Sequence, residues 1–317
     1  MRGLALAAVA AVALAACGSP SAPSGPVRAS ATHPLPGPEA GATHPQPTLT
    51  TGVPTIVRRG GQAPAAIVPA HTVIVMMENH SYGEVIGNPA APFLNALAHR
   101  GALFTHSHAV THPSEPNYLA LFSGSTQGIT DDSCPHLFTG PNLAAELFAA
   151  HHTFAGYSEG QPQTGAKVCA AGLYARKHVP WVNFTSVPVS ASKPLTAFPL
   201  GAYGRLPTVS FVIPNLCHDM HNSDCPVGTG DAWVKASLGP YLSWARTHRS
   251  LLIVDWDEND GGPGNKIPTI FAGPMVKPGN YPETITHYSV LRTIEYLYGL
   301  RPLGESALAR PIMNVWK

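Results

Sequence analysis

One apolar run of this 317-residue chain ends abruptly in polar residues. Val73–Met77 is too short for a typical helix and is β-branched at its start, so it predicts a buried strand. Glu78, Asn79 and His80 follow directly, and a turn is expected over Ser81–Gly83. Because open α/β sheets bind ligands just outside the carboxyl ends of their strands, these polar side chains are expected at a functional edge.

Strands and helices are predicted to alternate along the rest of the chain, with no internal repeat and no second linker. This alternation predicts an α/β fold of one domain, with a mostly parallel sheet that helices cover on both faces. The predicted strands are Thr72–Met77, Thr153–Tyr157, Thr208–Ile213, Leu251–Trp256 and Thr269–Ala272. The predicted helices are Pro92–Arg100, Asn117–Phe122, Leu143–His151, Asp231–Thr247 and Ser289–Tyr298.

The N-terminal segment predicts export. Residues 1–16 have a positive start and a short apolar core, which indicates a signal peptide. Leu14-Ala15-Ala16-Cys17 resembles a bacterial lipobox, so Cys17 is expected to carry a lipid and to hold the protein at the extracytoplasmic membrane face; ordinary cleavage and secretion without Cys17 is the alternative. The composition of residues 17–69, rich in Pro, Ala and Ser, predicts a disordered tether, and residues 70–317 are expected to form the folded domain.

Four cysteines remain after Cys17, an even number that suits an oxidising compartment. Three pairings are open, and we favour Cys134–Cys169 with Cys217–Cys225, because the second pair brackets one short polar loop. A zinc site is the alternative, although no Cys-x-x-Cys spacing occurs. The net charge of +1 gives no reason to expect a nucleic-acid partner.

A second strand end repeats the pattern of the first. Asp257 and Glu258 follow the apolar run Leu251–Trp256, and glycines at 261 and 262 permit a bend. Carboxylates, together with the amide oxygen of Asn79, suit a hard or borderline divalent cation, whose identity stays open. An acidic, solvated turn is the alternative. By strand alternation Asp255 shares a face with Asp257 and is expected behind the metal ligands.

Ser114 lies just before a helical stretch that opens at Pro116. A helix N-terminus offers free amide hydrogens and positive potential, which suit a phosphoryl oxygen. A metal beside the hydroxyl would lower its pKa and make Ser114 a nucleophile. The alternative is that Ser114 only caps the helix.

Two further loops carry imidazoles and cations. In Pro214–His221, Asp219 and His221 fit a site better than His218, and a free imidazole can protonate a leaving alkoxide. In Tyr174–Trp181, Lys177 and His178 indicate either a phosphate-facing loop or a basic surface loop.

Taken together, these segments resemble the bacterial phosphoesterase family that includes acid phosphatases and phospholipases C of the alkaline-phosphatase superfamily. The resemblance covers nearly everything from His71 to Trp316. Its motifs are Met77-Glu78-Asn79, Thr111-His112-Pro113-Ser114-Glu115-Pro116-Asn117-Tyr118, Tyr174-Ala175-Arg176-Lys177-His178-Val179-Pro180-Trp181-Val182-Asn183-Phe184 and Trp256-Asp257-Glu258.

The resemblance implies a three-layer α/β/α sandwich and metal-assisted phosphoryl transfer to a Ser or Thr, followed by hydrolysis. The implied metal ligands are Glu78, Asn79, Asp257 and Glu258, the implied nucleophile is Ser114, and the implied catalytic imidazoles are His178, His221 and the late His287. Substrate-binding roles are expected for His112, Asn117, Lys177 and Asp219.

The predicted activity is that of an acid phosphatase with a phosphoserine intermediate, acting on a phosphorylated small molecule or on a phosphoinositide or phospholipid head group. A phospholipase C-type diesterase is the alternative within the same family. A lipoprotein that kept the fold and only binds its ligand is the non-enzymatic alternative.

Overall fold

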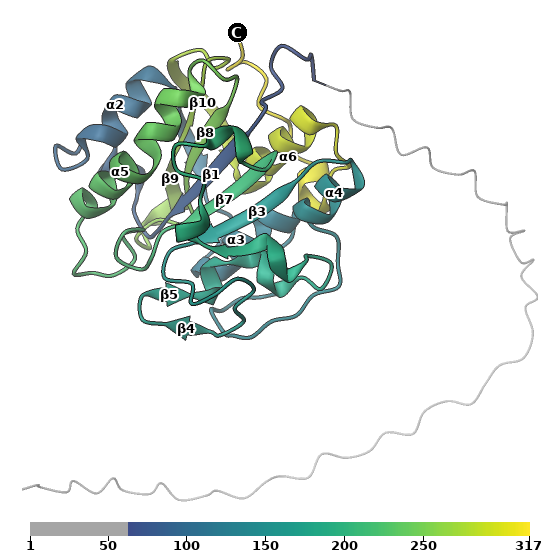
Figure 1. Cartoon of the computed structure of the whole chain (residues 1–317). Coiled ribbons are helices and arrows are strands. Elements are labelled where there is room, and N and C mark those ends of the chain that lie inside the picture. Colours follow the sequence, from purple (N-terminus) through teal and green to yellow (C-terminus); the bar gives the residue numbers. More distant parts are fainter. Residues whose placement is uncertain (1–62) are drawn as a thin grey trace, which may run out of the picture. The chain divides into compact units, whose positions relative to one another are not determined.

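The computed structural model describes residues 63–317, in which eight strands form one central sheet (Figure 1). The predicted signal peptide, the lipobox and residues 17–62 of the predicted tether lie outside the described residues. Ala63 and Ile67 already pack on the core, so the packed chain begins a few residues before the predicted boundary at residue 70. Between residues 63 and 317, no helix is both long enough and apolar enough to cross a membrane.

The sheet has the strand order β10-β2-β9-β8-β1-β7-β3-β6. Only β9 runs antiparallel to its neighbours, β2 and β8, so the prediction of a mostly parallel sheet is confirmed. The strands are β1 (Thr72–Met77), β2 (Ala102–His108), β3 (Phe154–Ser158), β6 (Ser192–Pro194), β7 (Val209–Ile213), β8 (Leu251–Trp256), β9 (Lys266–Ala272) and β10 (Gly279–Thr286).

Helices cover both faces of the sheet, as predicted. Along β1, Val73, Val75 and Met77 face one side, while Ile74 and Met76 face the other. The first side packs against α2 (Pro92–Arg100) and α5 (Val227–Ala245), and the second against α3 (Ser114–Ser123), α4 (Leu143–Ala149) and α6 (His287–Tyr298) (Figure 1). The short α1 (Tyr82–Val85) follows β1. Each apolar side chain fully buried in this way stabilises the fold by about 1.5–3 kcal/mol.

Short elements between β3 and β7 lie beyond the carboxyl edge of the sheet. They include the two-stranded sheet of β4 (Ala170–Ala171) and β5 (Tyr174–Ala175), and the 3-10 helices η1 (Arg176–His178), η2 (Pro180–Asn183) and η3 (Val189–Ala191). The fully buried Trp181 packs on Gly156 of β3, where an added Cβ would lie 2.1 Å from its ring. Glycine at this position therefore lets η2 pack closely against the sheet.

The two favoured disulfide pairings, Cys134–Cys169 and Cys217–Cys225, are both present. They close loops on the same side as β4 and β5. The first joins the loop that follows α3 to the segment before β4, 35 residues away. The second closes the loop between β7 and α5.

Candidate active site

Three neighbouring parallel strands deliver acids to one edge of the sheet. Glu78 follows β1, Asp257 follows β8, and Asp219 lies in the loop after β7. The backbone holds these ends together, because Asp257 N donates to Met77 O at 3.0 Å and Glu78 N donates to Asp219 O at 2.8 Å. The structure therefore gathers acids that are far apart in sequence.

Asn79 adopts the left-handed region with φ 48°, a conformation that asparagine tolerates better than most residues. Its backbone N donates to Asp257 Oδ1 at 3.2 Å. Its side-chain Oδ1 is buried and accepts no hydrogen bond within the described chain, and the same holds for Asp257 Oδ2. Buried oxygens without a donor are costly unless a ligand completes them.

Ser114 is the first residue of α3, and its side chain is not the helix cap. Its Oγ lies 3.1 Å from Glu78 Oε2 and 3.1 Å from Glu258 Oε1. A hydroxyl has one hydrogen to donate, so it can satisfy only one of these carboxylates at a time. The arrangement places an alcohol oxygen between two carboxylates at the positive end of a helix dipole.

Tyr118 lies one helical turn after Ser114 and faces the same way. Its hydroxyl donates a short hydrogen bond to Glu78 Oε1, and its ring stacks on His178 with centroids 5.0 Å apart. We assigned Tyr118 no role from the sequence, although its i+4 spacing from Ser114 could have indicated one. It fixes the positions of both Glu78 and His178.

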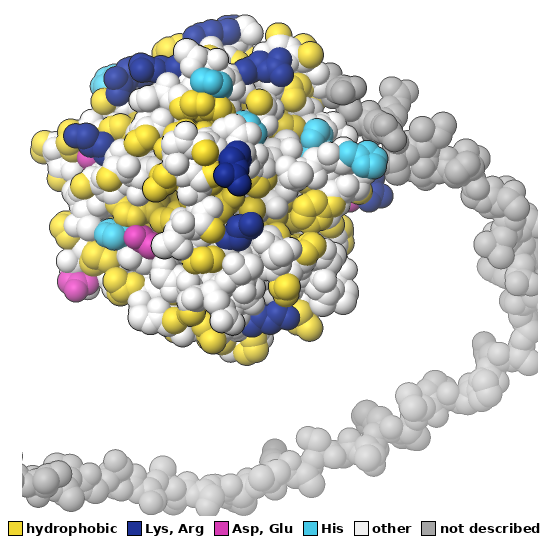
Figure 2. Space-filling view, viewed as in Figure 1, with side chains coloured by type: hydrophobic (Ala, Val, Ile, Leu, Met, Phe, Trp, Pro, Cys, Tyr) yellow, Lys and Arg dark blue, Asp and Glu magenta, His cyan; other side chains and the backbone are white. Residues whose placement is uncertain are grey.

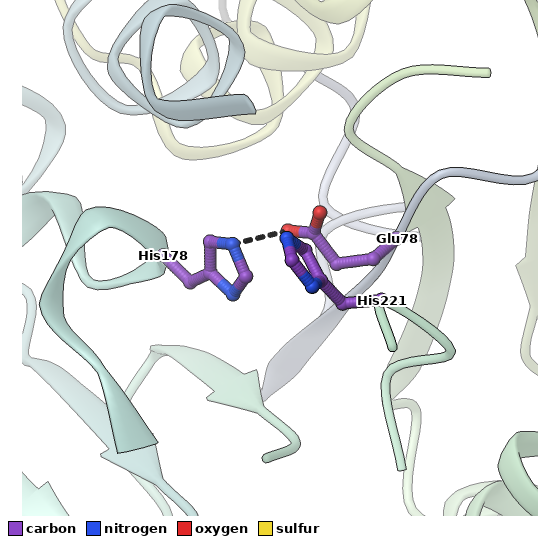
Figure 3. A group of neighbouring side chains, drawn as sticks. All are labelled: Glu78, His178 and His221. Atoms are coloured by element: carbon purple, nitrogen blue, oxygen red, sulfur yellow. Dashed lines mark ion pairs between the residues drawn. The ribbon is translucent and has the colours of Figure 1, made fainter. Parts of the chain in front are cut away.

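His178, from η1, is fully buried and lies between two acids, Glu78 and Asp219. Figure 3 shows its ring facing Glu78. Its Nε2 lies 3.0 Å from Glu78 Oε1, but off the line of a hydrogen bond, and its Nδ1 lies 3.3 Å from Asp219 Oδ2. Burial, and then the charge of Lys177, hold the pKa of His178 well below its usual value. This shift favours the neutral imidazole, the form that binds metals.

His221 and Lys177 lie together at the entrance to this cluster. Lys177 Nζ donates to Asp132 Oδ2 at 2.7 Å and lies 3.1 Å from His221 Nε2. Burial acts to lower the pKa of Lys177, but its bond to Asp132 and the charge of Glu78 produce a net rise. Burial, and then the charge of Lys177, lower the pKa of His221. Nothing in the sequence singled out Asp132, which reaches the site only through the fold.

The other predicted residues occupy more varied positions. His112 makes a short contact with Glu258 through its Nδ1 and so lies at the site. Asn117 accepts from Val110 N and Thr111 N and donates to Thr111 O, so its side chain shapes the loop before α3.

His287 donates to Trp256 O at 2.9 Å and lies 3.9 Å from Asp255 Oδ2. Both contacts are on β8, within the strand that leads to Asp257. Asp255 also accepts from Thr269 Oγ1 at 2.7 Å. His287 and Asp255 therefore support the strand end, and among the described residues His287 makes no hydrogen bond to Ser114.

Four acids share this buried space, and their charges oppose one another. Burial raises the pKa of Glu78, and the charge of Asp219 raises it further. Burial and Glu78 raise the pKa of Asp257, while burial also raises that of Asp219 and of Glu258. The positive charge of Lys177 acts in the other direction and lowers the pKa of Glu78. The cluster therefore favours a bound cation, which would let all four carboxylates ionise.

Two overlapping sets of donors fit a divalent cation. The predicted set, Glu78, Asn79, Asp257 and Glu258, offers oxygens, including the two unpartnered ones. A second set consists of Glu78, His178 and His221, with one ligand atom from each lying within 4.8 Å of the others (Figure 3). Carboxylate and neutral imidazole together suit a transition metal such as zinc or iron, as well as manganese.

The fold is that of the alkaline-phosphatase superfamily, as a comparison with solved structures shows. A member of this superfamily from Vibrio parahaemolyticus aligns with a TM-score of 0.55 and 14% sequence identity, and the alignment covers 83% of this chain and 75% of that one. The lipoteichoic acid synthase of Listeria monocytogenes aligns with a TM-score of 0.51 and 12% identity over 81% and 80%. At such identities these likenesses show the fold alone.

Within this class, the chain belongs to the Phosphoesterase family, whose model matches residues 88–301. It is 51% identical to the phosphatidylinositol-3-phosphatase of Mycobacterium tuberculosis, over 84% of this chain and 90% of that protein. It is 31% identical to the phosphate-repressible acid phosphatase of Penicillium chrysogenum, over 67% of this chain and 55% of the fungal protein, so it spans little more than half of that relative. The family predicted from the sequence motifs is confirmed.

Proposed function

We propose that this protein is an exported, metal-dependent acid phosphatase that hydrolyses phosphomonoesters through a phosphoserine at Ser114. Its relatives are named as a phosphatidylinositol phosphatase and acid phosphatases, which supports the class of phosphoric monoester hydrolases. The observation that carries the proposal is the position of Ser114 Oγ, 3.1 Å from both Glu78 and Glu258 at the N-terminus of α3.

In the first step, Ser114 Oγ bonds to phosphorus while the bond from phosphorus to the ester oxygen breaks. The hydroxyl proton moves to the carboxylate oxygen that accepts its hydrogen bond. His221, half-buried beside Lys177, protonates the leaving alkoxide. Because burial lowers the pKa of His221, its protonated form is a stronger acid than an ordinary imidazolium and forms at acidic pH.

In the second step, a water molecule attacks the phosphoserine, releases inorganic phosphate and restores the Ser114 hydroxyl. Lys177 and the first turn of α3 supply positive potential for the phosphoryl oxygens in both steps. Glu78, Asn79, Asp257 and Glu258 would hold the cation. When bound, a divalent cation supplies charge that favours the serine alkoxide and offsets the charge on the phosphoryl group.

The proposed substrate is a phosphomonoester on a small molecule or on an inositol-lipid head group, as the name of the mycobacterial relative suggests. The proposed location is the extracytoplasmic face of the membrane, with a lipid anchor on Cys17. The signal-peptide pattern and the two disulfides support export. Labelling with a radioactive fatty acid in a Gram-positive host should mark the wild type, and labelling of Cys17→Ser would refute the anchor.

The central test is turnover of a chromogenic phosphomonoester by Ser114→Ala. Loss of the nucleophile should lower kcat by about 10⁴-fold or more, whereas Ser190→Ala, an exposed serine of η3, should leave kcat unchanged. Turnover of Ser114→Ala at the wild-type rate would remove Ser114 from the mechanism.

A matched pair of substrates tests the type of ester. The proposal expects a phosphomonoester to be hydrolysed faster than a phosphocholine diester. The reverse preference would identify a phospholipase C-type diesterase.

A further inference from the structure

Four aliphatic side chains stand out into solvent on the loops beyond the sheet edge that bears the site. Leu137, Val168, Leu173 and Val189 are 68%, 47%, 45% and 59% exposed. We call these four residues the aliphatic rim. Single exposed apolar residues are common on soluble proteins. The rim therefore indicates a binding surface only if the fold fixes its members relative to one another and the charges around them favour one kind of partner.

The fold holds the rim together. Leu137, Lys167 and Val189 line one hollow of about 220 Å³. The disulfide Cys134–Cys169 ties the loop of Leu137 to that of Val168, and Leu173 lies at the turn between β4 and β5.

Arg176 connects the rim to the site. Its guanidinium, in a side chain only 5% exposed, donates to Lys167 O at 2.7 Å and to His136 O at 3.0 Å. It thus fixes the backbone beside Val168 and beside Leu137. The next two residues along η1 are Lys177 and His178 of the site, so rim and site share one short helix.

The stretch that carries Val168, Leu173 and Val189 has charge of one sign, whereas the loop of Leu137 also carries the exposed Asp131. From Gly160 to His218 the chain contains none of its 18 acidic residues, but it does contain five lysines and arginines, among them Lys167 and Lys193. Asp132, which borders the site, is paired with Lys177 at 2.7 Å. Figure 2 shows dark-blue beside yellow side chains near the lower edge of the domain. Exposed aliphatic side chains among lysines complement a surface that has a negatively charged outer layer and an apolar interior.

We propose that the aliphatic rim docks this protein on a lipid bilayer with anionic head groups, and that docking presents the site to a phosphorylated head group. The aliphatic side chains enter the head-group boundary while Lys167 and Lys193 stay at the anionic surface. The proposal rests on the proposed function for its choice of substrate. Docking itself is measured without turnover.

The experiment is co-sedimentation with phosphatidylcholine vesicles that contain or lack phosphatidylserine. Every protein is the full chain with Cys17→Ser, so that no lipid on residue 17 contributes. The test variant is Leu137→Ser with Leu173→Ser and Val189→Ser. Its matched control is Leu308→Ser, which changes an 83% exposed leucine beside β10, at the other end of the sheet.

The wild type should bind the phosphatidylserine vesicles, less strongly at high salt, and the triple variant should bind about tenfold or more weakly. The Leu308 control should bind like the wild type. On a water-soluble phosphomonoester all three should have equal kcat/KM, which shows that the variant is folded. If the triple variant misfolds, Leu173→Ser alone should give a smaller loss in the same direction.

Docking is refuted if the wild type does not sediment with anionic vesicles, or if the rim variants bind as well as the wild type. In that case a protein partner, and not a bilayer, would be expected to cover the rim. Hydrolysis of a soluble phosphomonoester without vesicle binding would overturn docking and leave the proposed function intact. Vesicle binding that depends on the rim, without any phosphatase activity, would support docking and overturn the proposed function.

Discussion

Glu78 and Glu295 are both fully buried carboxyl groups, but their surroundings differ. Glu295, on α6, accepts from Leu303 N at 2.9 Å and from Ser306 Oγ at 2.7 Å, so the protein supplies its donors. Glu78 has Asp219 and Asp257 beside it, and three buried oxygens around it, Asn79 Oδ1, Asp219 Oδ2 and Asp257 Oδ2, have no hydrogen-bond donor in the described chain. A buried carboxyl group that accepts hydrogen bonds from donors of the protein has a structural role. A buried carboxyl group that lies among other acids indicates a site for a cation.

The largest difference expected between Glu78 and Glu295 is in catalytic activity. Glu78→Gln should lower kcat/KM for a phosphomonoester by about a thousandfold, because it removes a charge from the cation site and an acceptor from Ser114. Glu295→Gln keeps the shape of a protonated carboxyl and should stay within about twofold of wild type. Similar losses in the two variants would mean that burial alone, and not the acidic cluster, explains the effect.

Removing the metal should also distinguish Glu78 from Glu295, because only the site at Glu78 should change the free energy of unfolding. Chelation of the wild type should abolish activity and lower the free energy of unfolding by about 3 kcal/mol, if the metal is present at about 100 times its Kd. Added Mn²⁺ or Zn²⁺ should restore both. Glu295→Gln should respond like the wild type and Glu78→Gln should not respond, as measured by thermal unfolding with and without chelator. A chelator-insensitive wild type would argue against the cation.

Glu295 should instead affect how the free energy of unfolding depends on pH. Burial raises the pKa of Glu295 to about 7 from 4.5. Between these values the folded protein keeps a proton that the unfolded chain releases. Stability is therefore greatest below the unfolded pKa and falls, by about 3 kcal/mol, as the pH rises through the folded pKa.

The measurement is urea unfolding at about pH 5 and about pH 8, with the Glu295→Gln variant alongside the wild type. The variant should lose this part of the pH dependence. An equally steep fall in both proteins would assign it to other groups.

The smallest effect concerns the hydrogen bond that orients Glu78. Tyr118→Phe removes the donor to Glu78 Oε1 but keeps the ring that stacks on His178. It should lower kcat about tenfold with little change in KM, since Tyr118 positions a ligand and does not touch substrate. A selective rise in KM would show that Tyr118 binds substrate directly.

Much of the central sheet could be predicted from sequence because its strands are buried on both faces. β1 and β8 are mostly apolar and fully buried, and their predicted limits match the structure. β10 was missed because it is an exposed edge strand that contains Pro282 and few apolar residues. β2 was missed because polar residues follow its short apolar start.

The core of the site was predictable for a related reason. Acids that follow neighbouring parallel strands must meet, so Glu78 and Asp257 could be placed together from sequence. The directions of Asn117 and His287, one toward its own loop and one toward the backbone of β8, depend on packing that sequence periodicity does not encode. The roles of Asn117 and His287 could therefore not be derived from the sequence pattern, and Asp132 was not predicted at all.

Anomalous X-ray diffraction from crystals grown with Mn²⁺ would show whether the acids at the sheet edge hold a cation. A strong anomalous peak is expected within about 2.5 Å of carboxylate oxygens of Glu78 and Asp257, beside Ser114. An anomalous map without a peak there, in crystals of active enzyme, would contradict the claim that these acids gather around a cation.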